Sequence, residues 1–328
     1  MGYNKENFRR IRTEYETKAL EAEHAAQLRR EELYHAVPAV EALDRRLSSF
    51  GLRIMEAALQ GGDAAEGVAA LREENERLSR ERAALLRAAG YPEDYSHVQY
   101  ECDACRDRGY VGIHMCSCMR KKLIEAGLAS CGMAELMRTQ SFENFSLEYY
   151  SANAEQGAMM SRNLHLVRRY AESFSMAEGK TSGNLLFLGG TGLGKTHLSS
   201  AVAREVIARG YDVYYSSAVG MLSDFEYRRF GNGLAAGDGD NTERYTECDL
   251  LILDDLGTEV VNQFTLSCLY HVFNTRINQR RPTIISTNLT MEELRKTYSD
   301  RITSRLFGEF LLIPFYGTDV RKQKLKKN

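Results

Sequence analysis

Two stretches near the N-terminus repeat apolar residues at spacings of three and four. The spacing runs over residues 40–57 and again over 68–85, and Gly61 and Gly62 lie between the two stretches. Such spacing places apolar side chains on one face of a helix. We therefore expect two helices that fold back at the glycines and bury their apolar faces against each other. An earlier helix, over about residues 5–34, is highly charged and carries only a weak stripe.

Polar residues interrupt the second apolar stripe at Asn75 and Arg82. At a helical seam such residues lower stability but fix the register or the choice of partner. The hairpin could serve as a cap on the next domain or as an arm that docks a partner. The polar seam positions favour the second interpretation, so we predict a helical, coiled-coil partner-binding arm over residues 1–95.

From Gly183 onward the pattern changes to short apolar runs that alternate with helical periodicity. Strands that alternate with helices are typical of a parallel sheet flanked by helices. Residues 232–241 (NGLAAGDGDN) cannot supply a core and are predicted to form a loop. The predicted fold class is therefore α/β with a parallel five-stranded sheet. The candidate strands are residues 185–188, 213–216, 250–253, 283–286 and 310–314.

The length of 328 residues and a hydrophobic fraction of 43% suit two domains. No apolar run approaches the roughly 18 residues that span a bilayer, and the first residues lack the apolar stretch of a signal peptide. We therefore expect a cytoplasmic protein. The formal net charge of -2 gives no general attraction to phosphate, so contact with nucleic acid requires a local basic patch.

Four of the seven cysteines fall between Cys102 and Cys118. Together with Cys105 and Cys116 they form two closely spaced pairs, the ligand pattern of a closed tetrahedral zinc site. His114 is a fifth candidate ligand, so an all-cysteine site and a site of three cysteines plus the histidine are both open, and the C-x-C pair favours the first. We predict a zinc-binding module over residues 96–125. The isolated cysteines are expected to pack as small apolar residues; they are Cys131, Cys248 and Cys268.

The segment after the strand 185–188 matches the pattern G-x-x-x-x-G-K-[ST]. It lies between an apolar run and a helical run, which is the context that this phosphate-binding loop requires. Backbone N–H groups of the glycines and the positive end of the following helix bind phosphate. Lys195 is expected to reach the β and γ phosphates of ATP, and Thr196 to offer its hydroxyl to Mg²⁺. The predicted nucleotide-binding residues are Gly189, Gly190, Thr191, Gly192, Leu193, Gly194, Lys195, Thr196 and His197.

Two adjacent acids follow the apolar strand 250–253. A P-loop requires a carboxylate at the end of a neighbouring strand to hold Mg²⁺ or its waters. We predict that Asp254 binds the metal and that Asp255 orients the attacking water. Asn288 follows the next strand and could align the γ phosphate. Alternatively, Asn288 caps the helix that begins near Thr290.

Arginines lie late in the sequence, after these motifs. Arg301 and Arg305 are four residues apart and therefore share a helix face. Arginines at such a place can neutralise charge on the γ phosphate of a neighbouring subunit, which requires self-association. Arg321 is a candidate to contact the nucleotide of its own chain. The sequence thus predicts an enzyme, an ATPase that converts ATP to ADP and phosphate.

The order of the motifs GGTGLGKTHL, LLILDDLGTE, STNL, RITSRL and GTDVR resembles the AAA+ ATPases that load bacterial replicative helicases, the DnaC and DnaI type, and the related IstB transposition ATPases. The resemblance covers about residues 142–321. It implies an AAA+ P-loop domain over residues 181–328, preceded by a linker and lead-in over residues 126–180. The lead-in includes Ser141–Phe145 (SFENF), which is similar to a segment that these families place near the adenine.

The same resemblance implies roles for the arginines. Arg301 and Arg305 match residues that act across a subunit boundary, and Arg321 matches the second sensor. Members of these families form rings or spirals that bind single-stranded DNA on the inner face. Candidates for DNA contact lie between the second and third strands, where aromatic and basic side chains could stack bases and meet phosphate; they are Tyr215, Ser217, Phe225, Tyr227, Arg228 and Arg229.

Three functions are consistent with these features. The leading hypothesis is a DNA replication protein that binds the replicative helicase, loads it onto single-stranded DNA and is released when ATP is hydrolysed. Some loaders resemble this chain in having a zinc-bearing helical N-terminal domain, which favours this hypothesis. The second is an IstB-like transposition helper that binds target DNA and a transposase. The third is a zinc-dependent adaptor in which the nucleotide is structural.

Overall fold

The computed structural model describes residues 3–51, 53–54, 64–151, 153–230 and 242–327. The predicted turn at Gly61 and Gly62 and the predicted loop 232–241 lie outside the described residues. The chain divides into two compact units, one of residues 12–118 and one of residues 1–11 with 119–328. Each unit is described by itself below. Among the described helices, none is both long and apolar enough to cross a membrane.

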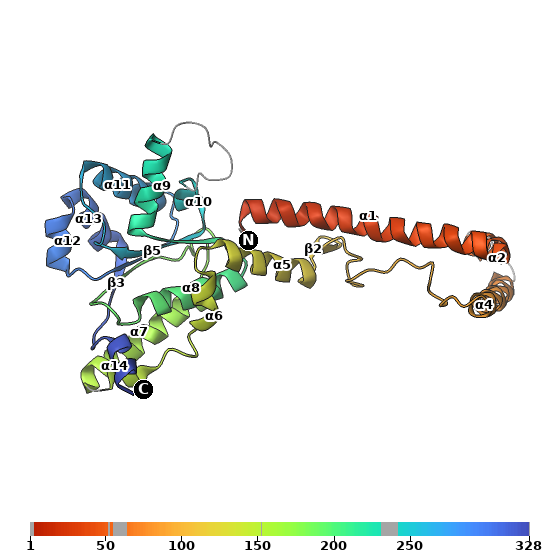
Figure 1. The fold of residues 1–328 in the computed structure, drawn as a ribbon, viewed down its shortest axis with the longest axis horizontal. Helices are drawn as coiled ribbons and strands as arrows, with labels where there is room; N and C mark the ends of the chain where they lie inside the picture. The colour runs from red at the N-terminus through yellow and green to blue at the C-terminus, as the bar shows by residue number, and fades with distance from the viewer. Residues whose placement is uncertain (1–2, 52, 55–63, 152, 231–241, 328) are drawn as a thin grey trace. The chain divides into compact units, whose positions relative to one another are not determined.

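The first unit is built mainly from helices (Figure 1). Leu43 and Phe50 of the first predicted stripe pack with Leu78 of the second, so the two stripes do contact each other as expected. A second cluster joins Val40 and Leu86 to Leu33, and so adds the preceding helix to the same packing. The helices are α1 (Lys5–Ala36), from residue 12 onward, α2 (Pro38–Ser48) and α4 (Ala64–Ala88).

The first helix is charged and only weakly striped, as expected, yet it buries one face. Tyr15, Ala19, Ala26 and Leu33 of α1 are all at most 5% exposed and recur every four or seven residues. Two of these positions are alanines, which bury well but contribute little to an apolar stripe. Arg29 of the same helix donates to the carbonyl of Tyr95 at 2.8 Å, which holds the segment after α4 alongside α1.

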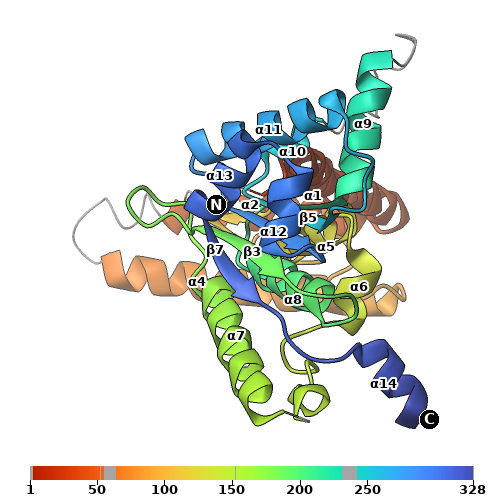
Figure 2. The same cartoon turned by 90° about the vertical axis from the view of Figure 1, so that its left-hand side faces the viewer.

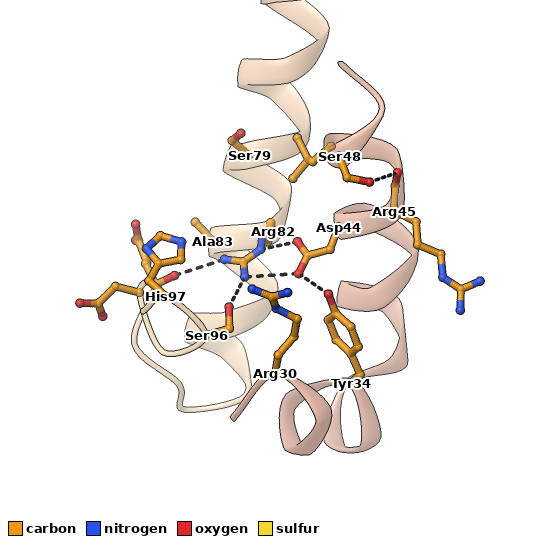
Figure 3. A pocket seen from close by; sticks show the side chains of 13 residues that line it. Arg30, Tyr34, Asp44, Arg45, Ser48, Ser79, Arg82, Ala83, Ser96 and His97 are labelled. Carbon is orange, nitrogen blue, oxygen red and sulfur yellow. Dashed lines mark hydrogen bonds and ion pairs between the residues drawn. The ribbon is translucent and has the colours of Figure 1, made fainter. Parts of the chain in front are cut away.

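Arg82, the polar residue of the predicted seam, is fully engaged within its own unit. Its guanidinium lies 2.6 Å from Asp44 Oδ1 and donates to Ser96 Oγ at 2.8 Å (Figure 3). The Tyr34 hydroxyl donates to the same Asp44 carboxylate at 3.0 Å. Figure 3 shows these groups converging on a pocket that Arg30 also lines. Arg82 therefore fixes the register of α2 against α4, the first of the two roles that a polar seam residue can have.

A two-stranded antiparallel hairpin follows the helices in the first unit. It consists of β1 (Tyr110–Val111) and β2 (His114–Met115), with Tyr110 opposite Met115. Ile113 at its tip is 90% exposed. The hairpin lies between the two cysteine pairs of the sequence.

The second unit contains the predicted parallel sheet of five strands, in the spatial order β4-β5-β6-β3-β7. All five predicted strands form, and four of them extend one to three residues beyond the predicted ends, mostly through polar residues. The strands are β3 (Asn184–Leu188), β4 (Val213–Ser217), β5 (Leu250–Leu256), β6 (Thr283–Thr287) and β7 (Phe310–Pro314). The predicted fold class is confirmed.

Helices cover both faces of the sheet (Figures 1 and 2). Alternate residues of β3 point to opposite faces, so Leu185 and Phe187 pack in one core and Leu186 in the other. Burial on both faces is why the strands are continuous apolar runs in the sequence. The first core contains α6 (Ala134–Thr139), the 3₁₀ helix η1 (Leu147–Tyr150), α7 (Ala154–Glu172) and α8 (Lys195–Ala208); the second contains α9 (Ala218–Phe230), α10 (Arg244–Glu247), α11 (Gln263–Asn278), α12 (Met291–Thr297) and α13 (Asp300–Glu309).

Two further helices complete the second unit: α5 (Ser117–Ser130), most of which belongs to it, and α14 (Val320–Lys327) at the end of the chain. Helix ends are capped by side chains that satisfy free N–H groups. Asn153 caps α7, Asn262 caps α11, and Thr290 with Glu293 forms a reciprocal capping box on α12.

Arg276 of α11 is fully buried and binds the starts of two strands. Its guanidinium donates to the carbonyls of Tyr245 (3.1 Å) and Cys248 (3.0 Å), just before β5, and of Pro282 (2.6 Å), just before β6. Its Nε donates to the Thr283 hydroxyl at 2.9 Å. Pro282 also accepts from the N–H of Leu251 and Cys248 from Arg281, so the arginine adds buried hydrogen bonds to these two carbonyls and supplies one to Tyr245.

Replacing Arg276 with methionine should destabilise the protein strongly. The variant keeps a long apolar side chain but removes every hydrogen bond of the buried guanidinium, so we expect the free energy of unfolding to fall by about 3 kcal/mol. Urea unfolding of the full chain, followed by circular dichroism, measures the change. Arg204→Met, at an exposed position of α8, is the matched control. Equal stability of the two variants would show that the contacts of Arg276 contribute nothing net.

Candidate nucleotide and metal sites

The predicted phosphate-binding loop connects β3 to α8 at the carboxyl end of the strand. Gly194 is the N-cap of α8 and has a φ of 87°, a left-handed conformation that favours glycine. The loop thereby turns sharply into the helix, whose first N–H groups have no partner within the helix. A helix N-terminus that follows a glycine loop attracts phosphate through these N–H groups and the helix dipole.

Lys195 folds back over this loop. Its ammonium donates to the carbonyl of Gly189 at 2.6 Å and to that of Gly190 at 2.7 Å. Burial lowers the pKa of Lys195, and the nearby carboxylates of Asp255 and Asp254 oppose this shift. The two hydrogen bonds hold the Lys195 side chain over the loop, where it can contact phosphate oxygens.

Asp254 is the charged group on which the neighbouring elements converge. It is only 2% exposed, and it accepts hydrogen bonds from Thr196 Oγ1 at 2.8 Å and from the Tyr215 hydroxyl at 3.1 Å, both on Oδ2. The Ser286 hydroxyl donates to Oδ1. The structure therefore brings together the two predicted magnesium residues, Thr196 and Asp254. It adds Tyr215 and Ser286, which the sequence analysis did not assign to this site.

Asp255 has a different environment from Asp254. It is exposed and has a φ of 54°, in the left-handed region that is strained for most residues but tolerated by aspartate. The ladder between β5 and β6 shifts register between Leu253 and Leu256, and Asp255 lies in this irregular stretch. Surrounding protein atoms partly desolvate the carboxylate and, with the adjacent Asp254, raise the pKa of Asp255, while Lys195 and Arg321 oppose this shift. The bulge therefore directs two adjacent carboxylates into separate environments.

Asn288 lies at the exposed tip of β6, between β5 and β3 in the sheet. The alternative that it caps the next helix is wrong. The N-cap of α12 is Thr290, whose hydroxyl accepts from the N–H of Glu293. Threonine can cap a helix as asparagine does, and Thr290 lies two residues closer to the start of α12. The sequence alone therefore did not decide between the two roles of Asn288.

The three predicted arginines lie on two helices. Arg301 and Arg305 are on α13, and the Arg305 guanidinium lies 5.8 Å from the centre of the Tyr270 ring. Arg321 is on α14, and its positive charge acts on the pKa of both Lys195 and Asp255. Arg321 is therefore close enough to the P-loop of its own chain to affect the charges there.

The segment Ser141–Phe145 contacts the nucleotide loop, as its similarity to the lead-in of these families suggests. His197 Nε2 lies 2.8 Å from the carbonyl oxygen of Ser141, and its ring meets the Phe145 ring edge-on. The sequence analysis missed Tyr150, whose hydroxyl donates to the carbonyl of Leu193 at 2.8 Å. Burial raises the pKa of Tyr150 to about 12, so the hydroxyl stays a donor at neutral pH. The signal in the sequence was that Tyr150 lies a few residues after SFENF, in the same lead-in segment.

Two of the residues considered for DNA contact are engaged inside the protein instead. The Tyr215 hydroxyl binds Asp254, and the Phe225 ring packs against Tyr245 in the second core. Aromatic residues beside a strand have the same sequence signal whether they pack inward or face solvent. Among the aromatic candidates, Tyr227 lies on the surface and is 59% exposed. The other candidates are Ser217, which accepts from the N–H of Gly220, Arg228, which donates to Thr242, and Arg229, which lies over the Phe264 ring.

The four clustered cysteines meet in the first unit. Their sulfur atoms all lie within 4.8 Å of one another. Cys102 Sγ is 3.8 Å from Cys116 Sγ, and Cys105 Sγ is 3.5 Å from Cys118 Sγ. Four thiolates around a tetrahedral zinc ion would be about 3.8 Å apart, given zinc–sulfur bonds of about 2.3 Å. The donor set and its spacing therefore fit a zinc ion.

His114 does not belong to this cluster. Its side chain is exposed on β2, and the metal-ligand group among the described residues consists of the four cysteines. Asp107 organises the first cysteine pair instead, because its carboxylate accepts the N–H groups of Glu101 and Cys102, both at 2.9 Å. The sequence analysis did not identify Asp107. Of the two ligand sets left open, the geometry supports the all-cysteine set.

Local hydrogen bonds tune the thiols. The backbone N–H of Cys118 lowers the pKa of Cys116 to about 7, whereas burial raises the pKa of Cys118 to about 12. The Tyr15 hydroxyl hydrogen-bonds Cys118. The three isolated cysteines, Cys131, Cys248 and Cys268, are buried as expected.

Residues 132–321 match the model of a protein family described as IstB-like ATP binding protein. This match covers more than half of the chain. The chain belongs to the IstB-like ATP-binding protein family. The match begins shortly before Phe142, where the resemblance of the motifs was expected to start, and ends at Arg321.

This IstB-like protein is also similar to curated proteins. It is 27% identical over 193 residues to the replicative helicase loader DnaC of Escherichia coli (strain K12), covering 58% of this chain and 73% of that protein. It is 26% identical over 231 residues to the phage-like element PBSX protein XkdC of Bacillus subtilis (strain 168), covering 66% of this chain and 82% of that protein. The crystal structure of the DnaC helicase loader aligns with a TM-score of 0.43 at 22% identity, covering 53% of this chain and 98% of that chain.

These comparisons confirm the resemblance that the motif order predicted. The protein combines a parallel five-stranded α/β sheet and a P-loop with membership of an ATP-binding family, and its sequence is similar to that of the replicative helicase loader DnaC. The family is described by ATP binding, and the loop between β3 and α8 has the geometry of a phosphate-binding loop.

Proposed function

We propose that this protein binds ATP together with Mg²⁺ and hydrolyses the ATP to ADP and phosphate. The observation that carries the proposal is the 2.8 Å contact between Thr196 Oγ1 and Asp254 Oδ2 beside the buried Lys195. Hydroxyl and carboxylate oxygens are ligands that Mg²⁺ prefers. Bound Mg²⁺ would neutralise charge on the phosphates.

The remaining residues have separate roles in this proposal. Lys195 contacts the β and γ phosphates, Asp255 orients the attacking water and Asn288 aligns the γ phosphate. Asp255 and Asn288 are both exposed at the ends of adjacent strands, which supports a shared approach to one ligand. Arg321 contacts the nucleotide within the chain, in agreement with the effect of its charge on Lys195.

Self-association completes the site in this proposal. Arg301 and Arg305 of one subunit would neutralise transition-state charge on ATP held by the next, as arginines supplied by a partner do in other P-loop enzymes. Arg301 is exposed on α13, which leaves it accessible to a neighbouring subunit.

Replacing Asp255 should separate ATP binding from hydrolysis. Asn keeps the size of the side chain and tolerates the left-handed backbone at this position, so Asp255→Asn is a cleaner test than Asp255→Ala. We expect ATP affinity within about twofold of the wild type and a kcat roughly 100-fold lower, because the group that orients the water is lost. Fluorescent-nucleotide binding and phosphate release measure the two quantities.

Lys195→Ala is the comparison for this experiment, because it should abolish ATP binding. Turnover of Asp255→Asn at the wild-type rate would mean that another residue aligns the water. Loss of both binding and turnover in that variant would assign Asp255 to nucleotide binding instead.

We further propose that the four-cysteine cluster holds a zinc ion that replaces a hydrophobic core in this short segment. The full chain, purified without added metal, should contain equimolar zinc by mass spectrometry. Cys105→Ser should lower the zinc content severalfold, whereas Cys268→Ser, which changes a buried cysteine outside the cluster, should leave it unchanged. Zinc-free protein with the four thiols paired as disulfides would contradict the assignment.

We propose that the biological role of this ATPase is to load a replicative helicase onto single-stranded DNA, with hydrolysis timing its release. The supporting observation is the similarity to the replicative helicase loader DnaC over 193 residues. The N-terminal helices and the cysteine hairpin would form the surface for the helicase. Apolar side chains exposed there support this assignment, and they include Leu20, Leu28, Val111 and Ile113.

The family match favours a second candidate function, an IstB-like transposition helper that binds target DNA and a transposase. The two candidates differ in their partner and in the DNA that stimulates them. ATPase activity stimulated by double-stranded DNA and the formation of filaments, without binding to a helicase, would support the transposition role.

A copurification experiment distinguishes these roles. The tagged full chain with ATP should retain the replicative helicase of the same host, and Ile113→Lys should lower the recovered helicase about tenfold if the hairpin is a hot spot. Leu325→Lys, at a position 79% exposed on α14, is the matched control and should leave recovery unchanged. The loader proposal fails if the wild-type chain recovers no helicase.

A further inference from the structure

We infer that Tyr215 is a positioning residue that fixes the orientation of the Asp254 carboxylate for Mg²⁺, and that the backbone at Cys131 and Gly132 holds Tyr215 in place. The inference rests on the proposed binding of Mg²⁺ and ATP at this site. It assigns a function to a tyrosine that lies on a different strand from Asp254 and outside the phosphate-binding loop.

Thr196 and Tyr215 both donate to Asp254 Oδ2, at 2.8 and 3.1 Å. Two donors on one oxygen, with Ser286 on the other, leave the carboxylate little freedom to rotate. Partners that orient a metal-binding carboxylate typically change metal affinity 10- to 100-fold when removed. Tyr215 occupies such a place beside the proposed magnesium pair.

Tyr215 lies on β4. β4 is an edge strand, so its outer N–H groups have no partner strand. The N–H of Tyr215 donates instead to the carbonyl of Cys131 at 2.8 Å. Gly132 lies against the same residue, since a Cβ atom added there would be 2.7 Å from the Tyr215 carbonyl oxygen. Residues 131 and 132 therefore take the place of a neighbouring strand at this one position.

Residues 131 and 132 are held in place by other elements. Ser130, directly before them, is anchored twice. Asn7 Nδ2 donates to its hydroxyl at 2.8 Å, and Arg244 donates to its carbonyl at 2.9 Å. The contact with the sheet edge is thus supported from two other elements. The anchored backbone of Ser130 and Cys131 thus binds the N–H of Tyr215, and the hydroxyl of Tyr215 binds the carboxylate of Asp254.

Tyr215→Phe tests the side chain. The variant keeps the ring and removes only the hydroxyl, so Thr196 and Ser286 still satisfy the carboxylate. We expect the Mg²⁺ concentration for half-maximal ATPase activity to rise about tenfold. ATP affinity measured in EDTA should stay unchanged. A merely structural role would leave the Mg²⁺ dependence unchanged and affect thermal stability alone.

Gly132→Ala tests the backbone contact. Gly132 has a φ of +88°, and alanine there would also collide with the Tyr215 carbonyl oxygen. Gly179→Ala is the matched control, because Gly179 has a φ of +73° but has nothing within 4 Å of the added Cβ. Both variants carry the same type of backbone strain, and only Gly132→Ala should raise the Mg²⁺ requirement.

The outcomes separate this inference from the proposed function. If the wild-type chain binds ATP equally with and without Mg²⁺, the proposed site fails. If the wild type depends on Mg²⁺ and Tyr215→Phe has the same dependence, only the role of Tyr215 is overturned. If Tyr215→Phe shifts the dependence and Gly132→Ala behaves like Gly179→Ala, the contribution of residues 131 and 132 is overturned.

Discussion

The buried carboxylate of Asp254 is the constraint on which the nucleotide site depends. A buried charge is costly unless hydrogen bonds satisfy it. Here the donors come from three elements, since Thr196 belongs to α8, Tyr215 to β4 and Ser286 to β6. These elements can meet only if β4, β5 and β6 are neighbours in register, as the sheet order provides. The same interaction therefore aligns the strands and holds the P-loop helix at their ends.

The sheet also explains why two adjacent aspartates differ. Regular strand geometry would direct Asp254 and Asp255 to opposite faces of the sheet. The register shift in β5 and the left-handed backbone of Asp255 instead leave the second carboxylate exposed beside Lys195, while the first stays buried. Local strain of this kind is retained at functional sites. It gives one carboxylate a fixed environment and the other access to water.

The sequence predicted those features that depend on local order. The five strands are apolar runs because both faces are buried, and the P-loop and the cysteine pairs have characteristic spacings. The features it missed are long-range. Tyr215 reaches Asp254 across 39 positions and Tyr150 reaches Leu193 across 43. Arg276 looks like an ordinary helical arginine, although its partners are carbonyls before two strands. Residue type alone does not indicate such partners, since they depend on the sheet order.

The nucleotide site and the cysteine hairpin differ in what holds their side chains in place. The nucleotide site is supported by cores on both faces of a sheet, so its polar residues are fixed by packing. The cysteine hairpin exposes Val111 and Ile113 and has two-residue strands, which bury little apolar surface. Its order would come from the proposed zinc ion and from the hydrogen bonds of Asp107. A metal-stapled hairpin can leave apolar residues exposed for a partner, because its fold does not depend on burying them.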